Sequence, residues 1–401
     1  MLGNILDAAR RMFPSVFSDV EFNSLSQKLV LSLIKVTPKK NVVASEHLVR
    51  MSLCKLATVA TGDAKQELLL LLGYRDDGQL SRCYSKVAQY IKIMKQSDLT
   101  VTNRIYLNYT SDIDPNFIKD SSEKDGVQVE KVGFNYPKAA AAHINNVLSS
   151  MTFRRITEIV DGDDVNKSTK MIIISGAHYK GTWETPFDYR LTKLTKFYHM
   201  DGSTSKVPMM NTMGEFGYAQ SKTCEVLTIK FMSYDTSITF VVPNNAKDFG
   251  NMLETIYRQK DFVNNLVKSE EVNLRKVSIP RFKIKTFVDW TGFLQGLGLT
   301  SVFTSNSTDL VGIFKAGKQN QPISLSKVKQ KVFLQIDEMG VGRKIPDPKM
   351  TEKPPEMTYY RVPTFVVDKP FYFEVSWDVE RGRYNIFAGV FYGPEPDLPS
   401  F

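Results

Sequence analysis

The stretch from Glu338 to Pro370, EMGVGRKIPDPKMTEKPPEMTYYRVPTFVVDKP, lies between two runs of residues that are typical of β-strands. The run before it is LSKVKQKVFLQID, and the run after it is FYFEVSWDVERGRYNIFAGVFYG. The part from Ile345 to Glu356 contains Pro346, Pro348, Pro354 and Pro355. Proline has no backbone donor and is disfavoured inside sheets. The stretch therefore predicts a long exposed connection, and such loops in compact proteins are usually functional or disordered.

The composition is that of a globular protein with a large core. The chain has 401 residues, of which 42% are hydrophobic and 11% aromatic. No apolar run is long enough to span a membrane. A net charge of +9 favours acidic surfaces such as sulfated glycans, nucleic acid or anionic lipid. The basic residues are scattered, however, which is typical of a cationic solvated surface and argues against nucleic acid.

The compartment is open on the sequence alone. The start, MLGNILDAARRMF, is interrupted by Asp7, Arg10 and Arg11 and does not have the pattern of a signal peptide. The chain is then either cytosolic or a mature form with an added initiator Met. Three sequons begin at Asn108, Asn166 and Asn306, and these glycosylation candidates favour secretion gently.

The cysteines predict neither a metal site nor a disulfide framework. Cys54, Cys83 and Cys224 are odd in number and show no C-x-x-C spacing. Cys54 lies in an apolar helical pattern, so we expect it to be a small core residue.

Helical patterns come first along the chain and strand patterns later, which predicts an α+β fold. Apolar periodicity predicts helices in 22–36, 48–56, 62–72, 81–95 and 139–151, with Gly73 as a helix stop. From Met171 onward, β-branched and aromatic runs such as MIIIS, SITFVVP and KVFLQID predict strands. No Gly/Ser-rich linker divides the chain, so we expect one domain over 1–401.

Motifs of common enzymes are missing from the sequence. We find no nucleophile elbow, phosphate-binding loop, H-E-x-x-H or dinucleotide motif. The short GVGRK at Gly340 has no third glycine. His47, His143, His178 and His199 are far apart and are expected to be surface or packed residues. The sequence thus predicts no enzyme, no cofactor and no metal.

Several blocks resemble the serpin superfamily, in the correct order and over nearly the whole chain. YKGTWETPF (Tyr179 to Phe187) resembles the family's strand-three signature, with Trp183 at the breach where the main sheet opens. KVPMMNTMGEFGY, VSIPRFKI, GFLQGLGLTSVF, VDKPFYFEV and IFAGVFYGP resemble further family blocks. The resemblance implies a single domain with three β-sheets and about nine α-helices.

The resemblance also makes 338–364 the reactive-centre loop region. In inhibitory members a protease cuts this loop, is acylated, and is trapped when the loop inserts as a central strand. The hinge positions are Glu338, Gly340, Val341, Gly342, Arg343 and Lys344. Lys349 and Met350 flank the candidate cleavage position nearest mid-loop.

The loop sequence is unfavourable for insertion. The resemblance places Val341 and Arg343 on the side of the new strand that faces the core. An unpaired buried charge costs on the order of several kcal/mol or more. Pro346 and Pro348 would each remove a hydrogen bond of the sheet, at about 1 kcal/mol or more. Inhibitory hinges instead resemble a threonine followed by small residues.

A second departure concerns the polar cluster that resembles the family's gate beneath the sheet centre. Inhibitory members usually have Ser, Ser, Asn and His there. The matching positions in this chain are Ser45, Leu48, Ser175 and Gln330, and Glu46 replaces a usual proline. Together these changes predict that sheet opening is no longer maintained.

The leading hypothesis is a non-inhibitory serpin whose loop is cleavable as a substrate and which acts by binding. The partner is expected to be a protein or an acidic glycan. An extracellular serine protease is expected to cleave the loop as a substrate and not to be trapped. The alternative is a secreted inhibitor of trypsin-like serine proteases. We expect a secreted monomer, with the cytoplasm as the alternative compartment.

Overall fold

The computed structural model describes residues 25–78, 80, 83, 99–123, 126–179, 181–232, 235–259, 261–305, 307–315, 322–341, 362–379 and 382–395. Within them the α-helices are α2 (Leu25–Val36), α3 (Glu46–Val59), α4 (Gly62–Leu72), α6 (Pro115–Glu123), α7 (Pro137–Met151), α8 (Phe249–Arg258), α9 (Phe262–Lys268) and α10 (Thr291–Gly296). The helix expected at 81–95 falls largely outside the described residues.

The first sheet has the strand order β10-β11-β4-β2-β3, with the short β12 paired to β11. Its strands are β2 (Leu99–Asn108), β3 (Gln128–Val132), β4 (Met171–Tyr179), β10 (Phe282–Asp289), β11 (Leu325–Asp337) and β12 (Gly340–Val341). The central strands β4 and β11 pair directly in parallel, with Gln330 opposite Ser175. We call the line between these two strands the seam; it is closed along its length.

The second sheet runs β1-β15-β14-β8-β7-β6-β9-β13, and β5 pairs with β6. Its strands are β1 (Val42–Ala44), β5 (Lys193–Tyr198), β6 (Thr204–Gln220), β7 (Cys224–Lys230), β8 (Thr236–Pro243), β9 (Glu271–Pro280), β13 (Thr364–Val366), β14 (Phe371–Val379) and β15 (Gly382–Phe391). The first six residues of β6, 204–209, pair with β5, and its last four, 217–220, pair with β7. This 17-residue strand joins the two smaller sheets that we expected to be separate.

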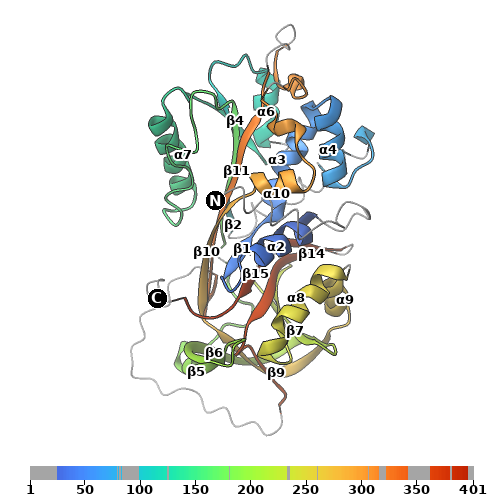
Figure 1. Cartoon of the computed structure of the whole chain (residues 1–401). Coiled ribbons are helices and arrows are strands. Elements are labelled where there is room, and N and C mark those ends of the chain that lie inside the picture. Colours follow the sequence, from blue (N-terminus) through green and yellow to red (C-terminus); the bar gives the residue numbers. More distant parts are fainter. Residues whose placement is uncertain are drawn as a thin grey trace.

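The core lies between the two sheets and around α3. Figure 1 shows the first sheet nearly edge-on, with α7 on its outer side and α2, α3 and α10 on the inner side. Even-numbered residues of β11, such as Val332 and Leu334, are buried in this core. A smaller apolar cluster holds α7 to the outer face through Ile144, Leu148 and residues of β4. Helix α7 lies so close that a Cβ at Gly176 of β4 would collide with Leu148.

The α+β class is confirmed, and most long elements fall where the sequence places them. Gly73 ends α4 in the left-handed conformation, as predicted. VNLRKVSIPRFKI, which looks like one run, is divided between β9 and β10 by Arg281.

The prediction for the cysteines was wrong in one respect. Cys54 of α3 and Cys83 form a disulfide across 29 residues, and Cys224 is a free buried thiol. Spacing along the chain did not reveal the pair because the fold brings the two Cα atoms to 6.3 Å. Cys54 is nevertheless a buried core residue, as expected.

Candidate functional site

The hinge of the loop is a tight reversal at the end of β11. After Asp337 the chain turns and β12 pairs back antiparallel, with Gly340 opposite Asp337 and Val341 opposite Ile336. Gly340 has φ +121°, and a Cβ there would collide with the backbone of Gly181 and Thr182. A glycine is therefore required at this point of the hinge. Gly342, Arg343, Lys344, Lys349 and Met350 lie outside the described residues.

Glu338 is a charged residue of the hinge and is buried, with only 1% of its surface exposed. Its Oε1 accepts a hydrogen bond from Thr192 Oγ1 at 2.7 Å and pairs with the Arg281 guanidinium. Its backbone carbonyl accepts from Phe187 N at 3.0 Å. A buried carboxylate needs such partners, because an unpaired one is strongly destabilising. These contacts fix the point at which the loop leaves the sheet.

Trp183 lies directly beneath this exit point and is fully buried. Its indole Nε1 donates to the Asp337 carbonyl at 2.8 Å, and its backbone N donates to the Met339 carbonyl at 3.2 Å. Its ring stacks on Phe231 with a centroid distance of 4.8 Å. The tryptophan expected at the breach is thus hydrogen-bonded to the backbone of the hinge itself.

Asp337, the last residue of β11, is a second buried carboxylate beside the turn. Burial raises the pKa of its carboxyl to about 7, and the neighbouring Glu338 charge adds to this effect. The Met339 amide, which donates to Asp337 Oδ1 at 3.0 Å, and Arg281 both oppose the rise in pKa. Asp337 therefore changes charge near neutral pH.

The polar cluster beneath the seam is brought together around Gln330. Gln330 Oε1 accepts from Ser45 N at 2.9 Å, while its Nε2 donates to Ser45 O at 2.7 Å and to Ser175 Oγ at 3.3 Å. All three residues are buried. One side chain of β11 thereby connects the start of α3 to β4, across the seam.

Leu48, the remaining position of the cluster, contributes only its backbone. Its carbonyl accepts from Asn103 Nδ2 at 2.8 Å, and Asn103 Oδ1 accepts from Ser52 Oγ at 2.9 Å. Asn103 lies opposite Ser175 in the sheet. The sequence analysis did not single out Asn103, Ser52, Thr192 or Arg281. Only Arg281 gave a signal, as a charged residue inside a strand-like run.

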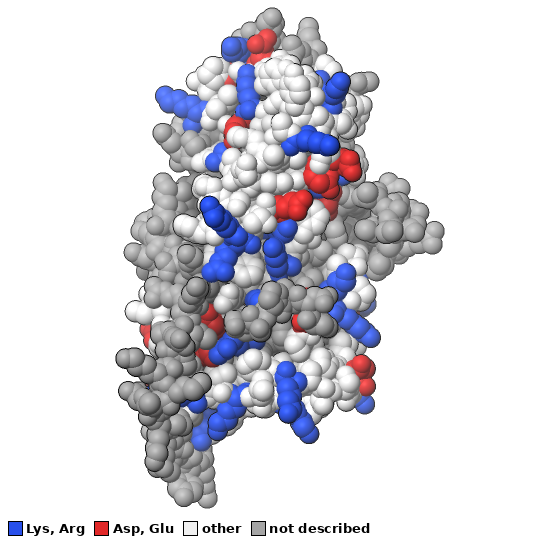
Figure 2. All heavy atoms as spheres, turned by 90° about the vertical axis from the view of Figure 1, so that its left-hand side faces the viewer, with Lys and Arg blue, Asp and Glu red and all other residues white. Residues whose placement is uncertain are grey.

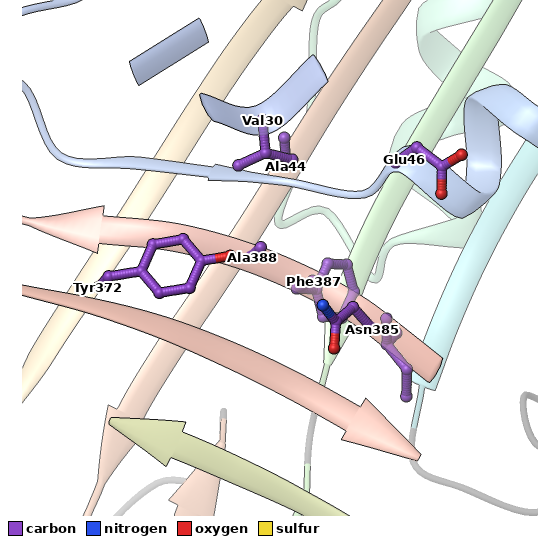
Figure 3. A pocket seen from close by; sticks show the side chains of 8 residues that line it. Val30, Ala44, Glu46, Tyr372, Asn385, Phe387 and Ala388 are labelled. Carbon is purple, nitrogen blue, oxygen red and sulfur yellow. The ribbon is translucent and has the colours of Figure 1, made fainter. Parts of the chain in front are cut away.

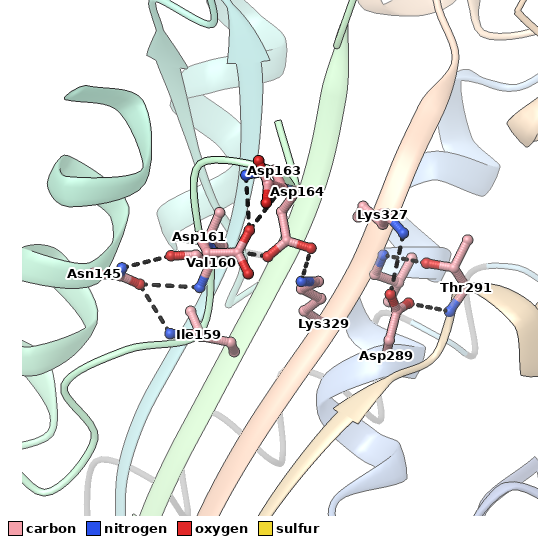
Figure 4. Close-up of polar contacts among 11 residues, drawn as sticks. Asn145, Ile159, Val160, Asp161, Asp163, Asp164, Asp289, Thr291, Lys327 and Lys329 are labelled. Carbon is pink, nitrogen blue, oxygen red and sulfur yellow. Dashed lines mark hydrogen bonds and ion pairs between the residues drawn. The ribbon is translucent and has the colours of Figure 1, made fainter. Parts of the chain in front are cut away.

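The segment that follows α7 crosses the outer face of the sheet and covers the seam. Asn145 of α7 holds it through Ile159 N at 2.9 Å and Val160 O at 2.7 Å. Asp164 then pairs with Lys329 of β11, as Figure 4 shows, and both side chains are largely buried. Lys331 of β11 donates to the Glu158 carbonyl. The segment is therefore fastened to β11 on the far side of β4.

A small hollow lies under α2, between Val30, Glu46, Tyr372 and Asn385 (Figure 3). Its free volume of about 10 Å³ is enough for roughly one water molecule. Glu46 is buried beside it, and its Oε1 accepts from Arg50 Nε at 2.6 Å. This hollow is too small for a drug-sized ligand.

The three sequons differ in their surroundings. Asn108 is buried, and its side-chain amide donates to the Thr169 carbonyl at 3.3 Å, so it is not accessible to a glycan in this fold. Asn166 is exposed, and its Oδ1 accepts from Ser168 N at 2.8 Å. Asn306 lies outside the described residues.

Among the described residues no group of His, Cys, Asp and Glu is placed to hold a metal ion. No helix in the described ranges is long and apolar enough to cross a membrane.

The closed central seam and the buried tryptophan under the hinge lie where the resemblance places them. A family model described as "Serpin (serine protease inhibitor)" matches residues 21–394. The chain therefore belongs to the serpin family. The resemblance seen in the sequence is confirmed.

The relatives of this chain include proteins named as protease inhibitors and proteins named as hormone-binding globulins. The chain is 26% identical to an antitrypsin of Bombyx mori over 374 residues, which is 92% of each chain. It is also 26% identical to a corticosteroid-binding globulin of Saimiri sciureus over 344 residues, 83% of this chain and 80% of that one. The solved structure of Serpin48 of Tenebrio molitor matches with a TM-score of 0.78 at 23% identity, covering 98% and 99% of the two chains. The family includes protease inhibitors and hormone-binding members that are not catalysts.

Proposed function

We propose that this chain is a non-inhibitory serpin. Its reactive-centre loop is cleaved as a substrate, does not enter the sheet, and leaves the protease free. The protein acts by binding a protein partner. The observation that carries the proposal is the sequence of the loop, in which Arg343, Pro346 and Pro348 stand where a central strand would have to form.

The surroundings of the seam explain why these residues oppose insertion. A strand between β11 and β4 would have one face against the core, beside Val332, Leu334 and Ala177. Arg343 on that face would be an unpaired charge among apolar side chains, at a cost on the order of several kcal/mol. A shift of register by one residue only replaces Arg343 with Lys344. Each proline removes one further hydrogen bond, at about 1 kcal/mol or more.

The contacts over and under the seam add to this barrier. Gln330 bridges the seam from below, and the Lys329–Asp164 pair fastens the covering segment from above. Both must break before β4 and β11 separate. Because trapping competes with hydrolysis of the acyl-enzyme, slow separation favours turnover of the chain as a substrate.

The test is incubation with trypsin-like serine proteases, followed by denaturing gels and thermal melts. We expect cleavage near Lys349, no complex that survives denaturant, and a melting temperature of the cleaved chain close to that of the intact one. A denaturant-stable covalent complex would overturn the proposal.

A matched variant distinguishes the effect of the loop sequence from the effect of the contacts at the seam. In it, Gly342 to Pro348 are replaced with small residues and the rest of the chain is unchanged. If this variant forms a complex, the loop alone prevents inhibition. If it is still only cleaved, the contacts at the seam also matter.

A working inhibitor of trypsin-like proteases is the second candidate. It is favoured by the antitrypsin of Bombyx mori among the relatives and by the basic residue at Lys349. The same gels decide between the two, since only this candidate forms the complex with the unmodified chain.

We also infer that the chain is a secreted, single-domain monomer. The Cys54–Cys83 disulfide supports an oxidising compartment, because structural disulfides are rare in the cytosol. The exposed sequon at Asn166 agrees with this.

A further inference from the structure

Strand β9 has a free edge along its first half. On one side it pairs with β6 over its whole length, from Glu271 to Pro280. On the other side it pairs with β13 only at residues 276–278. Figure 1 shows β9 at the lower end of the molecule. Among the described residues, 271–274 therefore have a neighbouring strand on one side only.

Val272 and Leu274 direct their backbone groups toward this free edge. The Lys276 amide points away from β6 and donates to the Pro363 carbonyl at 2.9 Å. Because the direction of these groups alternates along a strand, the amides and carbonyls of Val272 and Leu274 also point away from β6. Their side chains are 67% and 46% exposed. The edge thus offers both backbone hydrogen bonds and apolar contacts to another strand.

Strand β13 cannot extend over this edge. In its parallel register, the next hydrogen bond toward the start of β9 would run from the amide of residue 363 to the Leu274 carbonyl. Pro363 has no amide hydrogen, so this bond cannot form. A strand that covers the edge must therefore come from elsewhere.

Arg275, at the end of the free edge, is a buried cation without an ion pair. It is only 9% exposed, and its guanidinium lies 3.7 Å from the centroid of the Tyr218 ring. Its Nε has no hydrogen-bond partner, and it pairs with no carboxylate of the described residues. Glu225 instead accepts a hydrogen bond from the Tyr218 hydroxyl at 2.7 Å. Because an unpaired buried charge is destabilising, Arg275 favours a carboxylate supplied by a ligand.

The charges along this edge are ordered. Glu271 is exposed at its start, and Arg275 stands at its end. On the side of the molecule shown in Figure 2, by contrast, the basic side chains of the described residues are spread over the full height, with acidic ones between them. Charge alone therefore marks no comparable surface on that side.

We propose that the free edge of β9 binds an extended segment of the protein partner, which pairs antiparallel and reads apolar, acidic, apolar, basic from its amino end. Antiparallel pairing is the more stable arrangement per residue, and residues opposite each other share a face. The acidic side chain, opposite Asn273, lies beside Arg275, and the basic one lies opposite Glu271. The two apolar side chains cover Val272 and Leu274. This inference rests on the protein-binding function proposed above and names the segment that the partner presents.

The first test uses the peptide Thr-Thr-Val-Glu-Val-Lys-Thr-Thr with an amino-terminal fluorescein, in anisotropy titrations. We expect saturable binding, and slower hydrogen exchange at 271–275 in the complex, because the free amides of Val272 and Leu274 become hydrogen-bonded. A second peptide with lysine in place of glutamate should bind at least about tenfold more weakly, since its charge repels Arg275. Equal binding of the two peptides, or unchanged exchange at 271–275, would overturn the proposal.

The variant Arg275→Gln tests the buried cation. It should bind the two peptides with similar affinity, because the charge that distinguishes them is gone. The free protein should remain folded, since the substitution removes an unpaired buried charge. A variant that still prefers the glutamate peptide by about tenfold would show that Arg275 is only structural and would overturn its role.

The variant Leu274→Lys tests the edge itself, with Leu194→Lys as its matched control. A lysine on an edge strand opposes the addition of another strand, so Leu274→Lys should weaken peptide binding by about tenfold or more. Leu194 lies on β5 and is 69% exposed, so the control adds the same charge elsewhere on the second sheet and should keep the affinity. Equal weakening by both variants would overturn the site.

A second copy of this chain is the rival occupant, because 271–275 itself reads acidic, apolar, polar, apolar, basic. Sedimentation velocity of the unmodified chain should show no dimer that Leu274→Lys dissociates, and such a dimer would overturn the partner segment. The peptide titrations and the protease gels fail separately. A trapped protease would overturn the non-inhibitory function without affecting peptide binding, and a failure of the peptide to bind would leave the result of the gels unchanged.

Discussion

At the scale of single residues, the hinge concentrates charge where the chain must turn. Asp337 and Glu338 stand where the loop leaves the sheet, and both carboxylates are buried. Arg281 pairs with Glu338. Glu338 has a cation and a hydroxyl as partners, while Asp337 has mainly amides. The two acids therefore respond differently to pH.

We predict that Asp337 makes the protein less stable as pH rises through neutrality. Its pKa in the folded chain is about 7, above the ordinary value of 3.8, so the folded state holds the proton more tightly. For this group the free energy of unfolding is highest at low pH, falls as pH rises from about 4 to 7, and is then constant. Between pH 5.5 and 8 the loss amounts to about 2 kcal/mol.

The variant Asp337→Asn checks this, because an asparagine keeps the acceptor for the Met339 amide and cannot ionise. Urea unfolding at pH 5.5 and pH 8 should show that the variant lacks about 2 kcal/mol of the pH dependence of the unmodified chain. Identical pH dependence in the two proteins would contradict the prediction. Asp188, whose pKa is lowered by Arg190, provides a control, since Asp188→Asn should not alter stability in this pH window.

A second residue-scale prediction concerns the sequons. When the chain passes through a eukaryotic secretory pathway, we expect a glycan on Asn166 and none on Asn108, because the Asn108 amide is buried against Thr169. The mass lost on enzymatic deglycosylation should be smaller in Asn166→Gln than in the unmodified chain, and the same as in the unmodified chain in Asn108→Gln. A glycopeptide containing Asn108 would show the burial argument to be wrong.

At the scale of elements, local patterns were sufficient where a segment's own periodicity decides its structure. The apolar spacing of α3 and α7 and the β-branched run of β4 were predicted correctly for this reason. The three-residue β1 was missed, since it is a strand only through its pairing with β15. Local patterns could not pair Gln330 with Ser45, because these residues are 285 positions apart. Only the family resemblance placed them in one cluster.

The disulfide is the clearest case of an element-scale contact that spacing concealed. Cys54 of α3 is linked to Cys83 across 29 residues, and cross-linking a loop of this length stabilises a fold by about 2–4 kcal/mol. We predict that Cys54→Ala with Cys83→Ala lowers the free energy of unfolding by that amount. Reductant should have the same effect on the unmodified chain in urea titrations.

Cys224 supplies the control for that measurement. It is a buried free thiol whose pKa is raised by burial, so Cys224→Ala should leave the sensitivity to reductant unchanged. Thiol titration of the denatured, unreduced chain should find one free thiol. Three free thiols would show that the disulfide does not form, as the sequence analysis had predicted.

At the scale of the whole molecule, the resemblance established the family, but activity depends on whether two strands can part. The blocks around Trp183 and the carboxyl-terminal strands identify the fold because they fill its core. The Lys329–Asp164 pair could not be predicted in the same way. Asp164 stands in an irregular segment whose path over the sheet depends on α7 and on the Asn145 hydrogen bonds.

The last prediction follows from this pair. In the chain whose Gly342–Pro348 segment is replaced with small residues, adding Lys329→Met and Asp164→Asn should increase insertion. Removing both charges avoids leaving one of them buried and unpaired. A barrier lower by about 1 kcal/mol corresponds to roughly fivefold faster opening. The ratio of trapped complex to cleaved chain on gels, and the melting temperature after cleavage, should both rise.

The control is Lys327→Met with Asp289→Asn in the same background. This ion pair joins β11 to β10 on the same face of the sheet, and Figure 4 shows it beside the Lys329–Asp164 pair. It does not cross the seam, so its loss should leave the ratio of complex to cleaved chain unchanged. If both double variants increase insertion equally, general weakening of the sheet is responsible. If neither does, the covering segment does not limit opening, and the barrier lies beneath the sheet at Gln330.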